Sequence, residues 1–253
     1  MSALEAEIGD DGVATVWFNN PGHLNALSNE MVIGLCREFP RLGADGACTA
    51  IVLRGRGAVF CAGRELSDLK KLQSADPTAV AEMYGYMQKM NEVIYFCPKP
   101  VIGIIERYAL GIGVMLATWT DIALTEEGTV FGYPEVHHGI TPYGAVPTML
   151  NTMNQKGMLD LLMTGRRIDA YEAQRLGIVS RVVTKGALEQ ELARTLEDLG
   201  RGSAAAVMKS KQFVRECETL TYRQGIEAAT EKAIVGLGMP ETKAGVSRFF
   251  DRK

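Results

Sequence analysis

Short apolar runs and longer periodic stretches alternate along the first three quarters of the chain. The runs are bounded by glycine, proline, aspartate or asparagine, which is typical of strands ended by turns. They predict strands over residues 4–8, 13–18, 49–53, 101–105, 122–124, 129–131 and 178–183. Asp10-Asp11-Gly12 joins the first two strands into a predicted hairpin. Strands and helices therefore alternate up to about residue 183, which indicates an α/β fold.

Apolar residues spaced three or four positions apart predict the helices. Met31, Leu35 and Phe39 recur along one face of a helix that Ser28 can cap. A long helix begins at Asp76-Pro77 and is stopped by Pro98. After residue 183 the pattern is helical only. We therefore predict a core over residues 1–183 and a helical C-terminal region over residues 184–253.

Composition narrows the class of protein. The chain has 253 residues, of which 47% are hydrophobic and 23% charged, as expected for a globular protein. Its net charge of −3 argues against nucleic acid as the main partner. No apolar run is long enough to cross a membrane, and the N-terminus lacks the pattern of a secretory signal. We expect a cytoplasmic protein.

The cysteine and histidine patterns do not indicate a metal site. The five cysteines are an odd number without motif spacing, so we expect free thiols in a reducing cytosol. Neither Cys-x-x-Cys nor His-Glu-x-x-His occurs in the sequence. We predict no bound metal.

Two glycine-containing turns could together bind a carbonyl oxygen. Gly111-Ile112-Gly113 leads from a predicted strand into a predicted helix, where backbone N–H groups lack intrahelical partners. The segment 60–66 is a second turn of the same kind. If the turns converge, the N–H groups of Arg64 and Ile112 could hold one oxygen, each contributing about 3 kcal/mol in a transition state.

Five segments in order resemble the enoyl-CoA hydratase/isomerase family, the crotonase superfamily. They contain an early Asn-Pro…Asn-Ala-Leu motif, both turns, a segment around Glu135, and a late Thr-Gly…Ala…Gly-Ile-Val motif. They lie at residues 19–27, 59–66, 99–121, 131–142 and 164–179. The resemblance implies a crotonase-like spiral of repeated ββα units. It also implies an acyl-CoA substrate and a C-terminal region that assembles trimers or hexamers. Coenzyme A would be part of the substrate, with no permanently bound cofactor.

The resemblance assigns roles to particular residues. Arg64 and Ile112 would bind the thioester oxygen through their backbone N–H groups. Ala62, Arg64 and Gly111 would line the coenzyme A site. Glu135 aligns with the glutamate that moves protons at the acyl chain, and an apolar pocket would raise its pKa. Without the family context, Glu135 would be interpreted as a surface or salt-bridged acid at a strand end.

The sequence departs from the family pattern at two places. Met115 stands where hydratases of the best-known type carry a second glutamate, and a thioether cannot activate water. Losing such acid–base help typically costs about 10²–10⁴-fold in rate, so we predict double-bond isomerisation rather than hydration. Lyase or hydrolase chemistry with another second group, and a non-catalytic acyl-CoA-binding relative, remain alternatives. Glu106-Arg107 replaces a small polar residue and a glycine.

Other polar residues near the motifs have less specific interpretations. For Glu65, Asp68, His137, His138 and Tyr143, loop hydrogen bonding or surface exposure is favoured over catalysis. Cys61 lacks an evident base, so we predict a packing role. Cations that could contact coenzyme A phosphates are Arg54, Arg56, Arg64, Lys70, Lys71, Arg248, Arg252 and Lys253.

Overall fold

The structure is a computed structural model that describes residues 3–250, without the side chains of Glu241, Arg248 and Phe249. It forms two compact units, Met1–Ala193 and Arg194–Lys253. The division at residue 183, inferred from the sequence, stays a prediction about domain organisation. Within the first unit, both sheets and the predicted site residues are found.

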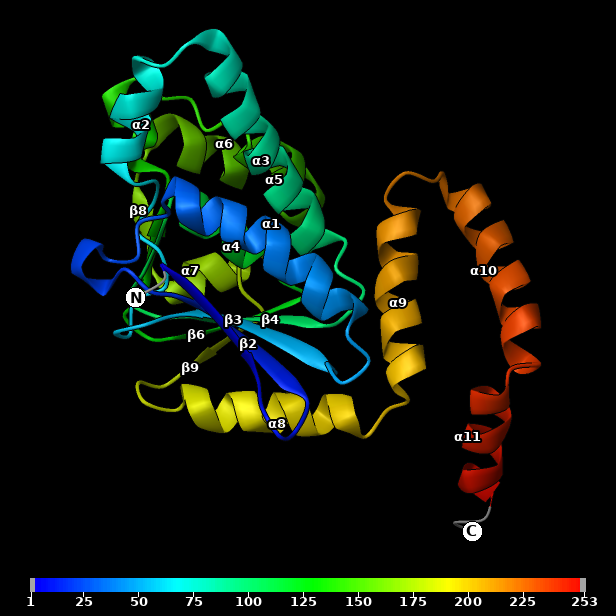
Figure 1. Cartoon of the computed structure of the whole chain (residues 1–253). Helices are drawn as coiled ribbons and strands as arrows, with labels where there is room; N and C mark the ends of the chain where they lie inside the picture. Colours follow the sequence, from blue (N-terminus) through cyan, green and yellow to red (C-terminus); the bar gives the residue numbers. More distant parts are fainter. Residues whose placement is uncertain (1–2, 251–253) are drawn as a thin grey trace. The chain divides into compact units, whose positions relative to one another are not determined.

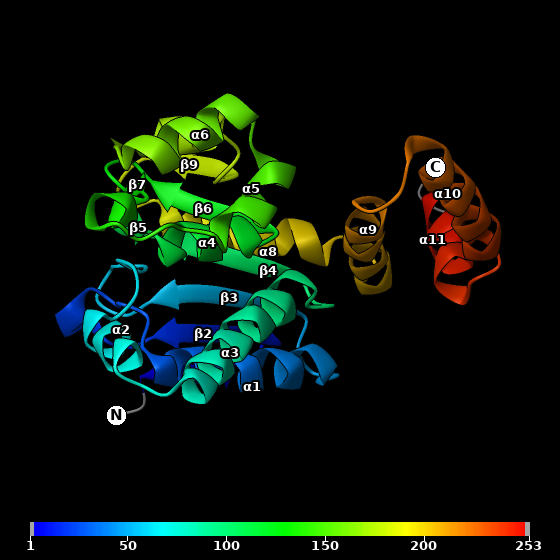
Figure 2. The same ribbon diagram turned by 90° about the horizontal axis from the view of Figure 1, so that it is seen from above.

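A six-stranded sheet forms the centre of the first unit. Its order is β1 (Leu4–Ile8), β2 (Val13–Phe18), β3 (Ala50–Gly55), β4 (Val101–Ile105), β6 (Ile122–Glu126) and β9 (Arg181–Val183). β1 and β2 pair antiparallel, which confirms the hairpin, and the remaining neighbours pair parallel. Figure 2 shows β2, β3, β4 and β6 following one another across this sheet.

A second, three-stranded sheet lies beside the site. It consists of β5 (Tyr108–Leu110), β7 (Val130–Gly132) and β8 (Arg167–Ile168). The sequence pattern predicts β7 but neither β5 nor β8, because two or three residues are too few to show a period. β5 pairs parallel with β7 through Leu110 and Gly132. This sheet thereby places the turn after Leu110 next to the segment that leads to Glu135.

Helices of the first unit pack against the sheets or against one another. They are α1 (Asn29–Ala44), α2 (Leu66–Gln73), α3 (Pro77–Tyr95), α4 (Ile112–Trp119), α5 (Ala145–Thr152), α6 (Gln155–Thr164), α7 (Ala170–Arg175) and α8 (Leu188–Gly200), the last of which runs into the second unit. Short 3-10 helices are η1 (Pro21–His23) and η2 (Pro134–His138). α1 and α3 lie side by side in both ribbon views (Figures 1 and 2). The predicted stripe Met31, Leu35 and Phe39 is buried in the core.

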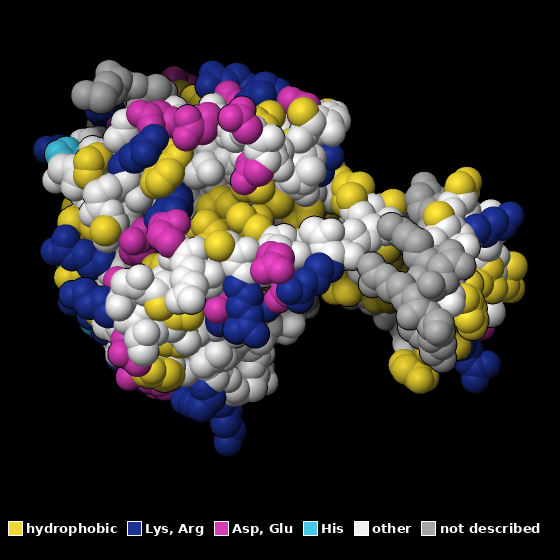
Figure 3. All heavy atoms as spheres, turned by 90° about the horizontal axis from the view of Figure 1, so that it is seen from below, with side chains coloured by type: hydrophobic (Ala, Val, Ile, Leu, Met, Phe, Trp, Pro, Cys, Tyr) yellow, Lys and Arg dark blue, Asp and Glu magenta, His cyan; other side chains and the backbone are white. Residues whose placement is uncertain are grey.

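The second unit contains the helices α9 (Ala204–Cys217), α10 (Tyr222–Leu237) and α11 (Pro240–Phe250). Large hydrophobic side chains are exposed on them, among them Tyr222, Ile234, Val235 and Leu237. Figure 3 shows hydrophobic side chains on the visible face of this unit, and acidic and basic side chains interspersed on that of the first. Within residues 3–250, no helix is long and apolar enough to span a membrane.

Candidate active site

The two glycine-containing turns lie against each other. Cys61 in the first turn forms a parallel bridge with Ala109 in β5. The Cys61 N–H donates to the Tyr108 carbonyl at 3.0 Å, and the Leu110 N–H donates to the Cys61 carbonyl at 3.0 Å. Gly113 lies so close to the Cys61 carbonyl that a Cβ atom there would collide with it. Segments about fifty residues apart are thus joined at the start of α4.

The amides of Arg64 and Ile112 are available at this junction. Neither N–H donates to an acceptor within the described part of the chain. Ile112 is the first residue of α4, where an N–H has no intrahelical partner. The Arg64 segment is held by Leu27, whose N–H donates to the Gly63 carbonyl at 2.7 Å and whose carbonyl accepts from Glu65 at 3.0 Å. Both amides can therefore bind a ligand oxygen.

The side chain and the backbone N–H of Arg64 have different roles. Its guanidinium donates to the Leu27 carbonyl at 2.7 Å and to Asn29 Oδ1 at 2.6 Å. The guanidinium is thus engaged with Leu27 and with the first residue of α1, and burial lowers the pKa of Arg64. The guanidinium therefore fixes the first turn in place.

Glu135 lies directly over the second turn. It belongs to η2 rather than to a strand end, and its side chain is half-buried. A Cβ atom on Gly111 would overlap the Glu135 carboxylate, so the two residues are in contact only because Gly111 has no side chain. Oxygen Oε2 of Glu135 is buried without a hydrogen-bond partner within residues 3–250. Burial raises the pKa of this carboxyl group.

Tyr133 is a second buried polar group beside Glu135. Its side chain is 0% exposed, and its hydroxyl oxygen has no hydrogen-bond partner among the described residues. Burial first, and then the charge of Glu135, raise its pKa well above the usual value, so the hydroxyl stays protonated. The sequence pattern does not mark this residue, because a tyrosine after a strand is usually explained by packing.

The segment after Glu135 is anchored to the C-terminal end of α6. Nε2 of His137 lies 2.8 Å from the Thr164 carbonyl, the geometry of a hydrogen bond donated by the ring. Gly165 follows with φ +60°, and a side chain there would meet His137. His137 thus holds the segment after Glu135 against the end of α6 and has a structural role.

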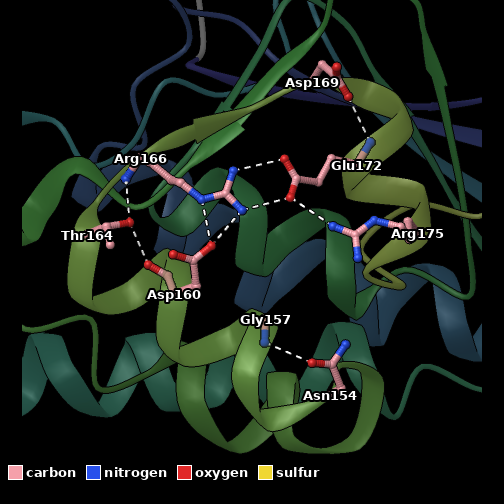
Figure 4. Close-up of polar contacts among 8 residues, drawn as sticks. All are labelled: Asn154, Gly157, Asp160, Thr164, Arg166, Asp169, Glu172 and Arg175. Carbon is pink, nitrogen blue, oxygen red and sulfur yellow. Dashed lines mark hydrogen bonds and ion pairs between the residues drawn. The ribbon is translucent and has the colours of Figure 1, made fainter.

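An ion-pair network holds the same region together (Figure 4). Arg166 donates from Nε to Asp160 at 2.7 Å and through both terminal nitrogens to Glu172, at 2.9 and 2.7 Å. Arg175 donates to Glu172 at 2.9 Å. The network joins α6, the residue before β8 and α7, and so supports the turn against which His137 packs.

The remaining acidic and polar candidates are engaged elsewhere or exposed. Glu65 caps α2, and a hydrogen bond from His23 lowers its pKa. Asp68 accepts from the Asn29 N–H at 2.8 Å. His138 and Tyr143 are exposed. These placements agree with the structural roles expected of Glu65 and Asp68.

Cys61 and Met115 are unsuited to acid–base work. Cys61 is fully buried, and burial raises the pKa of its thiol to about 12. Met115 is half-buried, and its methyl group lies close to Gly144 in the loop before α5. A thioether therefore occupies the position where the family pattern places a second carboxylate.

Several of the candidate phosphate-binding cations are already paired. Arg54 contacts Glu189 at 2.6 Å and Glu106 at 3.5 Å, and Arg56 contacts Glu5 at 2.8 Å. Lys71 pairs with Asp68 at 2.9 Å. Arg252, Lys253 and the side chain of Arg248 lie outside the described residues. Within residues 3–250, no group of three or more His, Cys, Asp or Glu side chains could hold a metal ion.

Comparison with known proteins shows the family of this chain. The family model for enoyl-CoA hydratase/isomerase matches residues 9–253. The chain is 24% identical to the 2,3-dehydroadipyl-CoA hydratase of Escherichia coli, covering 95% of this chain and 93% of that one. It belongs to the enoyl-CoA hydratase/isomerase family.

Solved structures confirm the fold predicted from the resemblance. An enoyl-CoA hydratase of Mycobacterium smegmatis superimposes with a TM-score of 0.92 at 25% identity, covering 99% of this chain and 97% of that one. Pseudomonas aeruginosa AtuE superimposes with a TM-score of 0.93 at 28% identity and the same coverage. The fold is the crotonase fold, and the chain is an acyl-CoA-processing enzyme of the hydratase/isomerase type.

Proposed function

We propose that this enzyme forms a thioester enolate from an enoyl-CoA substrate and uses Glu135 as its single acid–base group. The observation that carries the proposal is the position of the Glu135 carboxylate directly over Gly111, next to the Ile112 amide. A thioester oxygen held by the amides of Ile112 and Arg64 would place the acyl α-carbon near this carboxylate. Ala62, Arg64 and Gly111 would line the thioester and coenzyme A side of the site.

The proposed reaction is double-bond isomerisation. Ionised Glu135 removes a proton from C2 of a 3-enoyl-CoA, and the two amides stabilise the negative charge on the thioester oxygen. Glu135, now protonated, returns the proton to C4, and the double bond moves to C2–C3. No atom is added or lost, so one carboxyl group suffices. Burial favours the neutral carboxyl and so brings its pKa closer to neutrality.

Hydration of a 2-enoyl-CoA is the second candidate. The relatives reported above include proteins named as hydratases, which favours it. Met115 disfavours it, because hydration of the usual kind needs a second group to activate water. Lyase or hydrolase chemistry, and acyl-CoA binding without catalysis, are further alternatives that the same experiment tests.

Incubation with 3-enoyl-CoA and 2-enoyl-CoA in separate reactions decides between the reactions. Isomerisation leaves the mass unchanged and converts the first compound into the second, whereas hydration adds the mass of water. In deuterated water, an enolate-forming enzyme incorporates deuterium at the acyl α-carbon, and a pure binder does not. Isomerisation is contradicted if water addition is the only reaction observed.

Substitution of Glu135 tests the acid–base assignment. Glu135→Ala should abolish turnover and deuterium incorporation while coenzyme A binding is retained. Glu92→Ala, at an exposed position of α3, is the matched control and should keep the wild-type rate. An undiminished rate in Glu135→Ala would exclude the proposed mechanism.

We further propose that the exposed hydrophobic side chains of α10 are buried in a homotrimer or homohexamer. Tyr222 is 86% exposed, Ile234 69% and Leu237 69%. Such a concentration on one helix is typical of an interface between protein chains. Sedimentation of the full chain tests this assembly. A cytoplasmic location remains a prediction from the sequence.

A further inference from the structure

Tyr133 and Glu135 each present a buried oxygen that the protein itself leaves unsatisfied. The two residues flank Pro134 at the start of η2. The Tyr133 hydroxyl and Glu135 Oε2 are both buried, and neither has a hydrogen-bond partner within the described residues. A backbone hydrogen bond of 2.8 Å from Gly111 to Gly132 ties the residue before Tyr133 to the turn beneath Glu135. The pair therefore belongs to one small region.

A buried polar atom without a partner is costly. An interior polar atom that loses its hydrogen bonds to water must regain them elsewhere, so native proteins normally satisfy such atoms with protein or bound ligand. Phenylalanine would fill the same space as Tyr133 without that cost. Two unsatisfied oxygens two residues apart in the chain, with the charge of Glu135 acting on the Tyr133 hydroxyl, are the arrangement expected around one ligand atom.

The chemistry of the two groups restricts that atom. A protonated tyrosine hydroxyl donates a hydrogen bond, and an ionised carboxylate accepts one. The atom between them must accept from the first and donate to the second. A hydroxyl oxygen does both, whereas a methylene group does neither and a carbonyl oxygen cannot donate.

We propose that Tyr133 and Glu135 together form a binding site for one hydroxyl oxygen, supplied by water or by a 3-hydroxyacyl chain. The inference rests on the proposed function, because it requires the acyl chain to lie along Glu135. Tyr133 is then a residue that selects for an oxygen at this point of the substrate. It provides a hydrogen-bond donor near the acyl chain at a site whose second family carboxylate is replaced by Met115.

Binding measurements with two saturated thioesters test whether the substrate supplies the oxygen. Calorimetry compares 3-hydroxybutyryl-CoA with butyryl-CoA, which differ by a single hydroxyl group. Tyr133→Phe should weaken binding of 3-hydroxybutyryl-CoA about tenfold, or about 1.4 kcal/mol, and change butyryl-CoA binding less than twofold. Tyr171→Phe is the matched control, because it removes the hydroxyl of a surface tyrosine, which donates to Glu127. It should change neither affinity.

Crystal structures of the same complexes test whether water supplies the oxygen. With butyryl-CoA bound, the wild type should hold a water within hydrogen-bond distance of both Tyr133 and Glu135, and Tyr133→Phe should lose it. A water at this place, or the ligand hydroxyl in its stead, supports the proposal. Equal weakening of both thioesters by Tyr133→Phe, or complexes with no oxygen in contact with the Tyr133 hydroxyl, would overturn it.

Failure of this inference is separable from failure of the proposed function. The thioester affinities are measured without turnover, so they do not depend on which reaction is catalysed. If Glu135→Ala abolishes α-carbon exchange while Tyr133→Phe leaves both affinities unchanged, the enolate mechanism stands and the hydroxyl site does not. If Glu135→Ala leaves α-carbon exchange intact, the proposed enolate mechanism is wrong, whatever the two affinities show.

Discussion

The Glu135 carboxylate lies in the space that a side chain on Gly111 would occupy. Gly111 also has φ +53° and ψ −117°, a backbone conformation that a residue with a Cβ atom avoids. One glycine thus allows both the turn into α4 and the approach of the acid–base group. A substitution of Gly111 should therefore affect both activity and stability.

Gly111→Ala should reduce activity much more strongly than it reduces the stability of the fold. The new methyl group must displace the Glu135 carboxylate, and a displacement of about 1 Å at a reacting group can cost about 10²-fold in rate. Deuterium incorporation at the acyl α-carbon measures this loss, and thermal unfolding measures stability. Gly128→Ala is the matched control, because Gly128 has φ +86° but open space around it. If the two variants are equally active, the contact with Glu135 does not matter for catalysis.

The raised pKa of Glu135 predicts opposite pH dependences for activity and stability. Ionised Glu135 is the base, so kcat/KM should fall as pH drops through a pKa above the ordinary 4.5. The folded protein binds this proton more tightly than the unfolded chain does. The stabilising contribution is therefore complete below 4.5 and is lost as pH rises through the raised value.

Glu135→Gln separates these effects. The variant should be inactive but more stable than the wild type at pH 8, with the difference vanishing near pH 4. Unfolding curves at both pH values measure the difference. Equal stability of the two proteins at pH 8 would mean that burial does not penalise the ionised carboxylate.

Elements that depend on neighbouring residues are predicted from the sequence better than the site is. Ser28 and Asp76 cap α1 and α3 as expected, because capping depends on the nearest few residues. β5 and β8 are not predicted, since two or three residues become strands only through pairing with distant segments such as β7. Glu135 was assigned to the acid–base role from family resemblance, but its contact with Gly111 and the unsatisfied Tyr133 hydroxyl depend on segments brought together by the sheets.

Glu106-Arg107, unexplained at the sequence level, has a partial physical account in the structure. Glu106 pairs with Arg54 at 3.5 Å, although burial raises the pKa of its carboxyl group. Arg107 has φ +59°, which explains why glycine suits this position. Its guanidinium lies 5.3 Å from the centre of the Tyr108 ring. The presence of arginine in place of glycine thus adds a cation–π contact and introduces backbone strain.

Arg107→Gly should be more stable than Arg107→Ala by about 1 kcal/mol. Both variants lose the contact with Tyr108, but only glycine relieves the positive φ, whose cost of about 1–2 kcal/mol exceeds the added chain entropy of glycine. Urea unfolding of the two variants measures the difference. If alanine is as stable as glycine, the strain assigned to this position is absent.

The Arg166 network predicts a moderate effect on stability. Arg166→Met should destabilise the protein by about 1–2 kcal/mol, because two carboxylates lose a shared, partly bidentate partner. Arg201→Met is the control, since Arg201 also contacts two carboxylates, Glu197 and Asp198, but at a more exposed position. It should cost less than about 0.5 kcal/mol. Thermal unfolding at low and high salt measures both, and equal losses would contradict a special role of the network.

Met115→Glu should add water-adding activity, because it supplies the carboxylate that the family pattern places there. Met115 is half-buried, so burial would raise the pKa of the new group and permit acid–base exchange near neutral pH. Addition of water to 2-enoyl-CoA should rise about 10²-fold, the lower end of the range of about 10²–10⁴ typical of a well-placed acid–base group. Met115→Gln has the same size without the titratable proton and should leave hydration unchanged. Mass analysis of the products separates the outcomes. If both variants hydrate equally well, residue 115 acts through the shape of the pocket, and the distinction between isomerase and hydratase must depend on other residues.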